Sequence, residues 1–144
     1  MSRPTLCLLY LLFVPVCLGQ TITVRIIDVE TGRPLPSQRV SISLGYDKWD
    51  KKPANYISPV ILITDDEGTA QINFPSPAPS YVSFLVALSS DWWQSDRNQR
   101  FILKTGELIQ KGAVRRMVGE GKNEITPTAN PREVIILTRR LVYP

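Results

Sequence analysis

The sequence predicts an all-β fold, an antiparallel β-sandwich of about seven strands, from three observations. Several segments alternate apolar and polar residues with the period of two that is typical of half-buried strands. Clusters of Gly, Pro and Asp, which favour turns, separate these segments. The one segment with helix signals is short and covers about residues 105–112. We therefore expect one sandwich domain with a single short helical insertion.

Residues 1–19 have the features of a secretory signal peptide. Arg3 precedes an uncharged, mostly apolar run, TLCLLYLLFVPVCLG, that ends in small residues. The run is shorter than the roughly 20 residues that a membrane-spanning helix needs, which disfavours a retained anchor. We predict that residues 20–144 form the folded domain, and that the protein is secreted or periplasmic, at the cell envelope, without stable membrane insertion after cleavage.

The use of cysteine and histidine limits the chemistry of that domain. Both cysteines, Cys7 and Cys17, lie in the predicted signal segment, and the chain contains no histidine. Disulfides, Ser-His-Asp and Cys-His catalytic arrangements, and the usual zinc sites are therefore excluded after Gly19. We expect no metal, no cofactor and no catalytic residue.

The charge is mildly basic. From Gln20 onward the chain has 16 basic and 13 acidic residues, a net charge of +3. This excess suits weak attraction to anionic surfaces but lacks the dense basic clusters of nucleic-acid-binding proteins. We expect no nucleic-acid partner.

The first two strands are separated by a turn. In TITVRIID the inward face carries Ile22, Val24 and Ile26. In RVSISL the inward face carries Val40, Ile42 and Leu44. Between these runs, VETGRPLPS contains one glycine and two prolines, which break both helix and sheet. We expect this stretch to form a corner of the sandwich.

The next two strands are VILIT, residues 60–64, and TAQINF, residues 69–74. The intervening DDEG suits a type I turn, with Asp65 first and Gly68 fourth. We expect the two strands and the turn to form a hairpin.

The same turn raises the possibility of calcium binding, because Asp65, Asp66 and Glu67 are consecutive carboxylates. The stretch lacks the alternating spacing and the distal glutamate of an EF-hand loop. We favour a plain acidic turn over a weak calcium loop.

The second half of the chain predicts two or three further strands and the helix. YVSFLVALSS is apolar on both faces, as expected of a central strand, and residues 100–104 form a short one. In TGELIQKG, Thr105 is a candidate N-cap, and Leu108 and Ile109 are expected to dock the helix. Residues 132–143 close the fold as an apolar strand.

The order of these motifs resembles the carboxypeptidase regulatory-like domain, which has a transthyretin-like (prealbumin-like) β-sandwich fold. The resemblance covers Gln20 to Ser89. The residues at matching positions are Asp28, Thr31, Gly32, Pro34, Leu35, Val40, Thr64, Asp65, Gly68, Phe74 and Tyr81. This sequence departs from the pattern at Ser80, where the family usually has Gly, and at DWWQ, where it has Gly-Tyr. The resemblance implies a non-catalytic module, either a folding aid or a surface or carbohydrate-associated domain.

The DWWQSD stretch is the first candidate ligand site, through Asp91, Trp92, Trp93 and Asp96. Exposed tryptophans can stack on sugar rings or insert into a partner. The alternative, which we favour, is that one or both tryptophans cover the open end of the core, because Trp is highly buried on average.

The second candidate is a basic patch of five residues. Its members are Lys111, Arg115, Arg116, Arg139 and Arg140. Such a patch would suit anionic glycans or phospholipid. Solvated faces of a helix and of strands explain the same residues, and we favour that interpretation.

Together these observations predict a secreted, non-catalytic binding or structural module of the cell envelope, with a glycan or an envelope protein as partner. The alternative is a small carboxylate-based hydrolase. A buried pair of acids about 5 to 10 Å apart would favour the hydrolase, and scattered solvated acids would exclude it.

Overall fold

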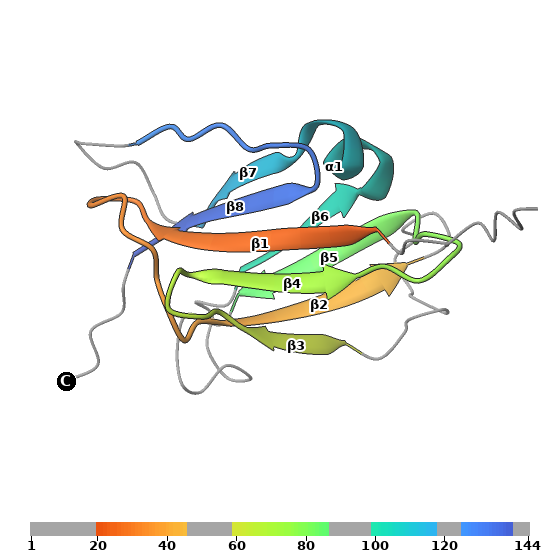
Figure 1. Cartoon of the computed structure of the whole chain (residues 1–144), viewed down its shortest axis with the longest axis horizontal. Helices are drawn as coiled ribbons and strands as arrows, with labels where there is room; N and C mark the ends of the chain where they lie inside the picture. Colours follow the sequence, from red (N-terminus) through yellow and green to blue (C-terminus); the bar gives the residue numbers. More distant parts are fainter. Residues whose placement is uncertain (1–19, 46–58, 87–98, 118–124, 140–144) are drawn as a thin grey trace, which may run out of the picture.

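Eight strands and one helix follow one another in the computed structural model, which describes residues 20–45, 59–86, 99–117 and 125–139 (Figure 1). The elements are β1 (Thr21–Asp28), β2 (Arg39–Gly45), β3 (Val60–Ile63), β4 (Thr69–Asn73), β5 (Tyr81–Val86), β6 (Gln99–Lys104), α1 (Thr105–Lys111), β7 (Ala113–Arg116) and β8 (Glu133–Thr138). The strands form two four-stranded sheets, in the orders β4-β1-β8-β7 and β3-β2-β5-β6. The predicted all-β sandwich with one short helix is confirmed.

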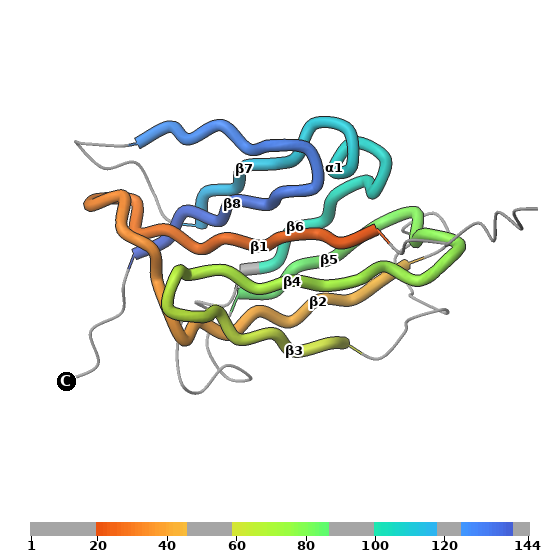
Figure 2. Tube along the Cα trace, in the orientation of Figure 1, coloured from red at the N-terminus to blue at the C-terminus, as the bar shows by residue number. Residues whose placement is uncertain are grey.

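The sheets are mainly antiparallel, but β8 pairs in parallel with both of its neighbours, β1 and β7. The strand β7 was not expected from the sequence. After β7, the segment 125–132 leads back to the end of the sheet at which β7 starts, so that β8 starts at the same end as β7 (Figure 2). This return explains how two strands that are close in sequence come to lie in parallel.

The main core fills the space between the sheets. The inward faces predicted for β1 and β2 are confirmed, since Ile22 and Val40 and their alternate neighbours are all buried. In β5, Val82, Phe84 and Val86 are buried on one face. The ring of Phe84 stacks on that of Phe101, with 5.0 Å between the ring centroids. Period-two alternation therefore identified the buried faces of β1 and β2 correctly.

A second, smaller apolar cluster covers the outer face of the β4-β1-β8-β7 sheet. Its buried members are Ile27, Val29, Ile135 and Leu137, and the partly buried Val114, Ile125 and Ala129 pack against them. Because the main core lies on the other face, β8 is enclosed on both sides, and all six of its residues are buried.

The stretch after β1 forms a corner between the sheets, as predicted. The amide of Gly32 donates to the carbonyl of Asp28 at 2.8 Å, and the hydroxyl of Thr31 donates to the carboxylate of Asp28 at 2.8 Å. Gly32 has a φ of 70°, a conformation that glycine adopts without strain. The chain then enters β2 in the opposite sheet.

The predicted hairpin of the third and fourth strands is wrong. The tight turn exists, since the amide of Gly68 donates to the carbonyl of Asp65 at 2.9 Å. However, β3 belongs to one sheet and β4 to the other, so the turn is a second corner. Turn chemistry indicates where the chain reverses, but it does not indicate whether the two arms pair with each other.

The helix α1 follows β6 directly. Leu108 is buried in the main core and Ile109 packs against it, as predicted. The predicted N-cap is wrong, because Lys104 occupies that position without a side-chain cap, and Thr105 is buried inside the first turn. The Thr105 side chain is therefore buried against the protein and does not cap the helix.

Candidate functional site

The first predicted site cannot be placed in the fold. Asp91, Trp92, Trp93 and Asp96 all lie outside the described residues. Whether the two tryptophans stack on a ligand or pack over the open end of the core therefore stays a prediction.

The predicted basic patch is not one cluster among the residues that the structure describes. Lys111 ends α1, whereas Arg115 and Arg116 lie at the far end of β7. Arg116 pairs with Leu137, two residues before Arg139, so these two arginines belong to the same end of the sheet. The side chain of Arg139 forms an ion pair with Glu30, at 3.2 Å between Nε and Oε1. The fifth member, Arg140, lies outside the described residues.

The acidic turn has a structural use. The carboxylate of Asp65 accepts hydrogen bonds from the amides of Glu67 at 3.0 Å and Thr69 at 2.9 Å, and from the Thr69 hydroxyl at 2.9 Å. These bonds, above all those from Thr69, hold the pKa of Asp65 below its ordinary value. Within the described ranges, no group of three or more Asp, Glu, His or Cys side chains is arranged to hold a metal ion. The calcium interpretation gains no support.

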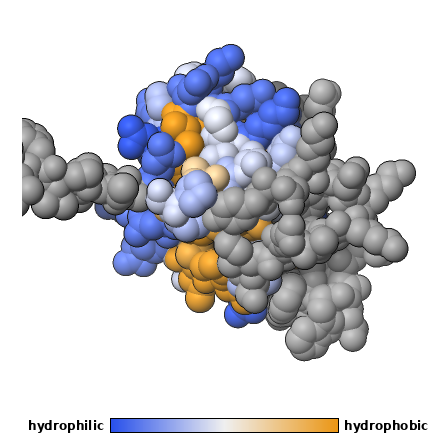
Figure 3. Space-filling model, turned by 90° about the vertical axis from the view of Figure 1, so that its right-hand side faces the viewer, coloured by the Kyte–Doolittle hydropathy of each residue, from blue (hydrophilic) through white to orange (hydrophobic). Residues whose placement is uncertain are grey.

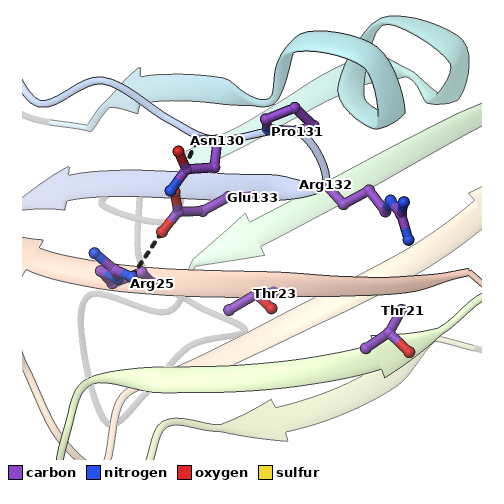
Figure 4. Close-up of a pocket in the computed structure, with 7 residues that line it drawn as sticks. All are labelled: Thr21, Thr23, Arg25, Asn130, Pro131, Arg132 and Glu133. Carbon is purple, nitrogen blue, oxygen red and sulfur yellow. Dashed lines mark hydrogen bonds and ion pairs between the residues drawn. The ribbon is translucent and has the colours of Figure 1, made fainter.

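A polar hollow of about 410 Å³ lies over β1 and the start of β8 (Figure 4). Thr21, Thr23 and Arg25 project from β1 into it, because they form the polar face of this alternating strand. The other wall is the segment Asn130–Glu133, which leads into β8. The parallel pairing of β1 with β8 places Glu133 opposite Thr23 and so joins the two walls.

An ion pair lies at one end of the hollow. Nη2 of Arg25 is 2.9 Å from Oε1 of Glu133, with the Arg25 side chain 43% exposed and that of Glu133 7% exposed. The second carboxylate oxygen of Glu133 accepts from the backbone amide of Asn130 at 2.9 Å and from its side-chain amide at 3.3 Å. The Oε1 atom accepts no hydrogen bond of good geometry, so Arg25 is its main polar contact. Glu133 is therefore covered by Arg25 and orients it, while the rest of the guanidinium faces solvent.

The opposite wall is a tight turn with unusual backbone geometry. The amide of Glu133 donates to the carbonyl of Asn130 at 3.0 Å, and Arg132 between them has a φ of 64°. A side-chain-bearing residue in this left-handed region costs about 1 kcal/mol or more. The backbone of Arg132 is held on both sides, by the carbonyl of Leu108 and the amide of Thr23, each at 3.0 Å. Its guanidinium extends toward the Thr21 end of the hollow (Figure 4).

The hollow presents mainly hydrogen-bond donors. Arg25 and Arg132 supply guanidinium groups, Thr23 supplies a hydroxyl, and the single lining carboxylate, that of Glu133, is covered. The hydroxyl of Thr21 already donates to Asn73 at 2.6 Å and can still accept. With two positive charges against one negative charge, the site suits an oxygen-rich ligand that bears negative charge.

The sequence alone did not reveal this hollow. The polar face of β1 is visible in TITVRIID, but the sequence alone assigns Glu133 to an apolar terminal strand. The sequence does contain a signal for the hollow, the polar stretch Asn130–Glu133 directly before an apolar run. It becomes meaningful only when β8 is known to pair with β1.

Comparisons with known proteins identify no family: no family model matches the chain, and no curated protein matches it. Solved structures that it is similar to include catechol 1,2-dioxygenase from Acinetobacter sp. ADP1 inhibited by bound mercury, with 18% identity over 60% of this chain and a TM-score of 0.35. Another is a 9R-lipoxygenase from Cyanothece PCC8801, with 14% identity over 85% of this chain and a TM-score of 0.37. The matches span only 36% and 16% of those two chains. Similarities this low carry no functional argument.

Within its described residues, the structure has no helix with the length and hydropathy needed to cross a membrane.

Proposed function

We propose that this protein is a secreted, non-catalytic binding module of the cell envelope, related to the carboxypeptidase regulatory-like domains, and that it binds an acidic glycan in the polar hollow. The observation that carries the proposal is the wall of donors formed by Arg25, Thr23 and Arg132 in an open hollow. Sugar hydroxyl, carboxylate and sulfate oxygens are acceptors that such a wall can bind, and guanidinium groups bind carboxylates in bidentate geometry.

The backbone of Arg132 supports the proposal. Glycine or asparagine would occupy the left-handed position at lower cost, yet the residue there is an arginine whose charge points along the hollow. Residues held in such backbone conformations by the surrounding structure are common at binding sites. The choice of arginine at this position is explained if its guanidinium has a ligand.

The hydrolase alternative is less favoured by the geometry. A glycosidase needs two carboxyl groups that reach the scissile bond. The residues that line the hollow include one carboxylate, Glu133, and Arg25 covers it. A covered carboxylate can position its neighbour but cannot contact a substrate.

The test is to measure binding of a uronate hexasaccharide by calorimetry in the parent protein and in Arg132→Gly. Glycine relieves the strain, about 1 to 3 kcal/mol, and adds unfolded-state entropy worth about 0.5 to 1 kcal/mol. We expect an unchanged or slightly raised Tm and an affinity at least tenfold lower. Equal affinity in the two proteins would refute the assignment of the hollow.

Ser37→Gly is the matched control. Ser37 also has a positive φ, 58°, but it does not line the hollow. We expect a similar effect on Tm and no effect on binding. If Trp92→Ala removes binding while Arg132→Gly does not, the ligand binds at the DWWQSD stretch instead.

A further inference from the structure

Four strands form the edges of the two sheets, and three of them carry polar or charged exposed side chains. The edge β4 presents Gln71 and Asn73, β6 presents Arg100 and Lys104, and β7 presents Arg115 and Arg116. Charged residues on an edge oppose its pairing with another chain, and exposed polar side chains leave the edge without apolar surface to bury. These three edges are therefore protected.

The fourth edge strand, β3, carries no charged or polar side chain and is protected only by its short length. It consists of four aliphatic residues, of which Val60, Ile61 and Ile63 are 40%, 51% and 61% exposed. Figure 3 shows hydrophobic surface low on the molecule, at the height where β3 lies in Figure 1. An apolar edge among protected ones indicates a surface that another strand covers.

The backbone of β3 has the geometry for strand addition. The amide of Thr64 donates to the carbonyl of Gln38 at 3.0 Å, which defines this pair as hydrogen-bonded. Because hydrogen-bonded and non-hydrogen-bonded pairs alternate along an antiparallel ladder, the backbone of Leu62 faces Val40 on β2. The amides and carbonyls of Ile61 and Ile63 consequently face the open edge.

We infer that β3 is a self-association surface, on which a second copy of this chain pairs through its own β3 in antiparallel register about a two-fold axis at Leu62. In this register Ile61 lies opposite Ile63 of the second copy, and these are the residues whose backbone groups face outward. Four main-chain hydrogen bonds form, and the two sheets join into a continuous sheet of eight strands. Ile61 and Ile63 of both copies form one apolar cluster on the outer face.

A second copy fits this edge because it supplies every feature that the edge requires. The strand carries no charge, so the two-fold axis brings no like charges opposite each other within β3. The side chains that meet lie on the same face of the joined sheet, which a register shifted by one residue would not allow. Each copy has one such edge and the other three are protected, so association stops at two copies.

The interface is small because β3 has only four residues. It falls below the area of stable protein–protein interfaces, which places the dimer among weak, reversible complexes. We expect dimerisation to develop between about 10 µM and about 1 mM protein.

Sedimentation of the purified protein over this concentration range tests the inference. The parent should shift from monomer to dimer, and Ile61→Lys should stay monomeric throughout with an unchanged Tm, because this side chain is half exposed. The matched control Gln71→Lys adds the same charge to the exposed face of the β4 edge and should dimerise as the parent does. A parent that is monomeric at about 1 mM, or an Ile61→Lys dimer, would overturn the inference.

Disulfide cross-linking tests the register of the β3–β3 pairing directly, without relying on a variant that fails to dimerise. In a background with Cys7→Ser and Cys17→Ser, Leu62→Cys places two sulfurs across the axis at a non-hydrogen-bonded pair, within disulfide range. Ile63→Cys places them two positions apart, beyond that range. We expect a disulfide-linked dimer for the first variant only. Equal cross-linking of both variants contradicts the register.

Discussion

Two segments of nearly the same sequence have opposite environments in this protein. VILIT begins at Val60 and forms β3, whereas VIILT begins at Val134 and forms most of β8. The β8 side chains are all buried, but β3 contains the exposed large aliphatic residues of the described chain. The comparison shows that the environment of an apolar strand is determined by its neighbours and not by its composition.

The two strands differ in how many strands they pair with and in how many of their faces are covered. β8 pairs with β1 on one side and β7 on the other, and apolar clusters cover both of its faces. β3 pairs only with β2, and of its side chains Leu62 packs against the core. Burial of apolar area supplies the main favourable term in folding, so the two strands should contribute unequally to stability.

The largest expected effect on stability tests whether an apolar strand contributes more when it lies inside a sheet than at its edge, whichever of the two sheets it belongs to. β5 belongs to the same sheet as β3 but lies inside it. Phe84→Ala should cost about 3 to 5 kcal/mol, because Phe84 is fully buried and stacks on Phe101. Ser41→Ala, on the outward face of β2, should change stability by less than about 0.5 kcal/mol. Urea unfolding measures both, and equal costs would contradict the assigned strand faces.

The next prediction compares β8 and β3 directly. Ile136→Ala should cost about 2 to 5 kcal/mol, since the side chain is fully buried in the main core. Ile63→Ala removes the same atoms from an exposed site and should stay within about 0.5 kcal/mol when the protein is dilute. The free energies of unfolding at low micromolar concentration provide the measurement. A large cost at Ile63 under these conditions would mean that β3 is covered within the monomer.

A third prediction concerns the corner that ends β3. Gly68 has a φ of 70°, and a Cβ there would lie 2.8 Å from the carbonyl oxygen of Ile26. Gly68→Ala should therefore cost about 1 to 3 kcal/mol. Gly106→Ala is the control: a Cβ at this helical position meets nothing within 4 Å, and it should stabilise by about 0.5 to 1 kcal/mol. Thermal melts of both variants provide the measurement. An unchanged Tm for Gly68→Ala would mean that the corner accommodates a Cβ at this position.

The smallest effect is the pH dependence of the same corner. Hydrogen bonds from Thr69 and Glu67 lower the pKa of Asp65 in the folded state. A lowered folded-state pKa stabilises the protein above the unfolded-state pKa, and this contribution is lost as the pH falls through the folded-state value. The Tm difference between the parent and Asp65→Ala should thus shrink on acidification below about pH 4.

Asp66→Ala serves as the control for that experiment. It removes a neighbouring acidic side chain without removing the hydrogen bonds that Asp65 accepts. If both variants show the same pH profile, general acidity of the turn and not the Asp65 bonds is responsible.

Features that depend on one segment at a time could be predicted from the amino-acid sequence. The alternation in TITVRIID and RVSISL identified the buried faces of β1 and β2, and the glycine and prolines between them identified a corner. The helix and its docking residue Leu108 followed from local signals in the same way. These features were predictable because periodicity and turn preference act over a few neighbouring residues.

Which segments become neighbours could not be predicted from the sequence and follows from the packing of the folded chain. The near-identity of VILIT and VIILT left β3 and β8 indistinguishable, and a tight turn did not show that its arms enter different sheets. The candidate site depended on the same choice, because Arg25 and Glu133 form their ion pair only when β8 lies parallel to β1. A strand's side-chain pattern specifies its two faces, whereas its pairing partner is selected by the packing of the whole chain, which no single segment records.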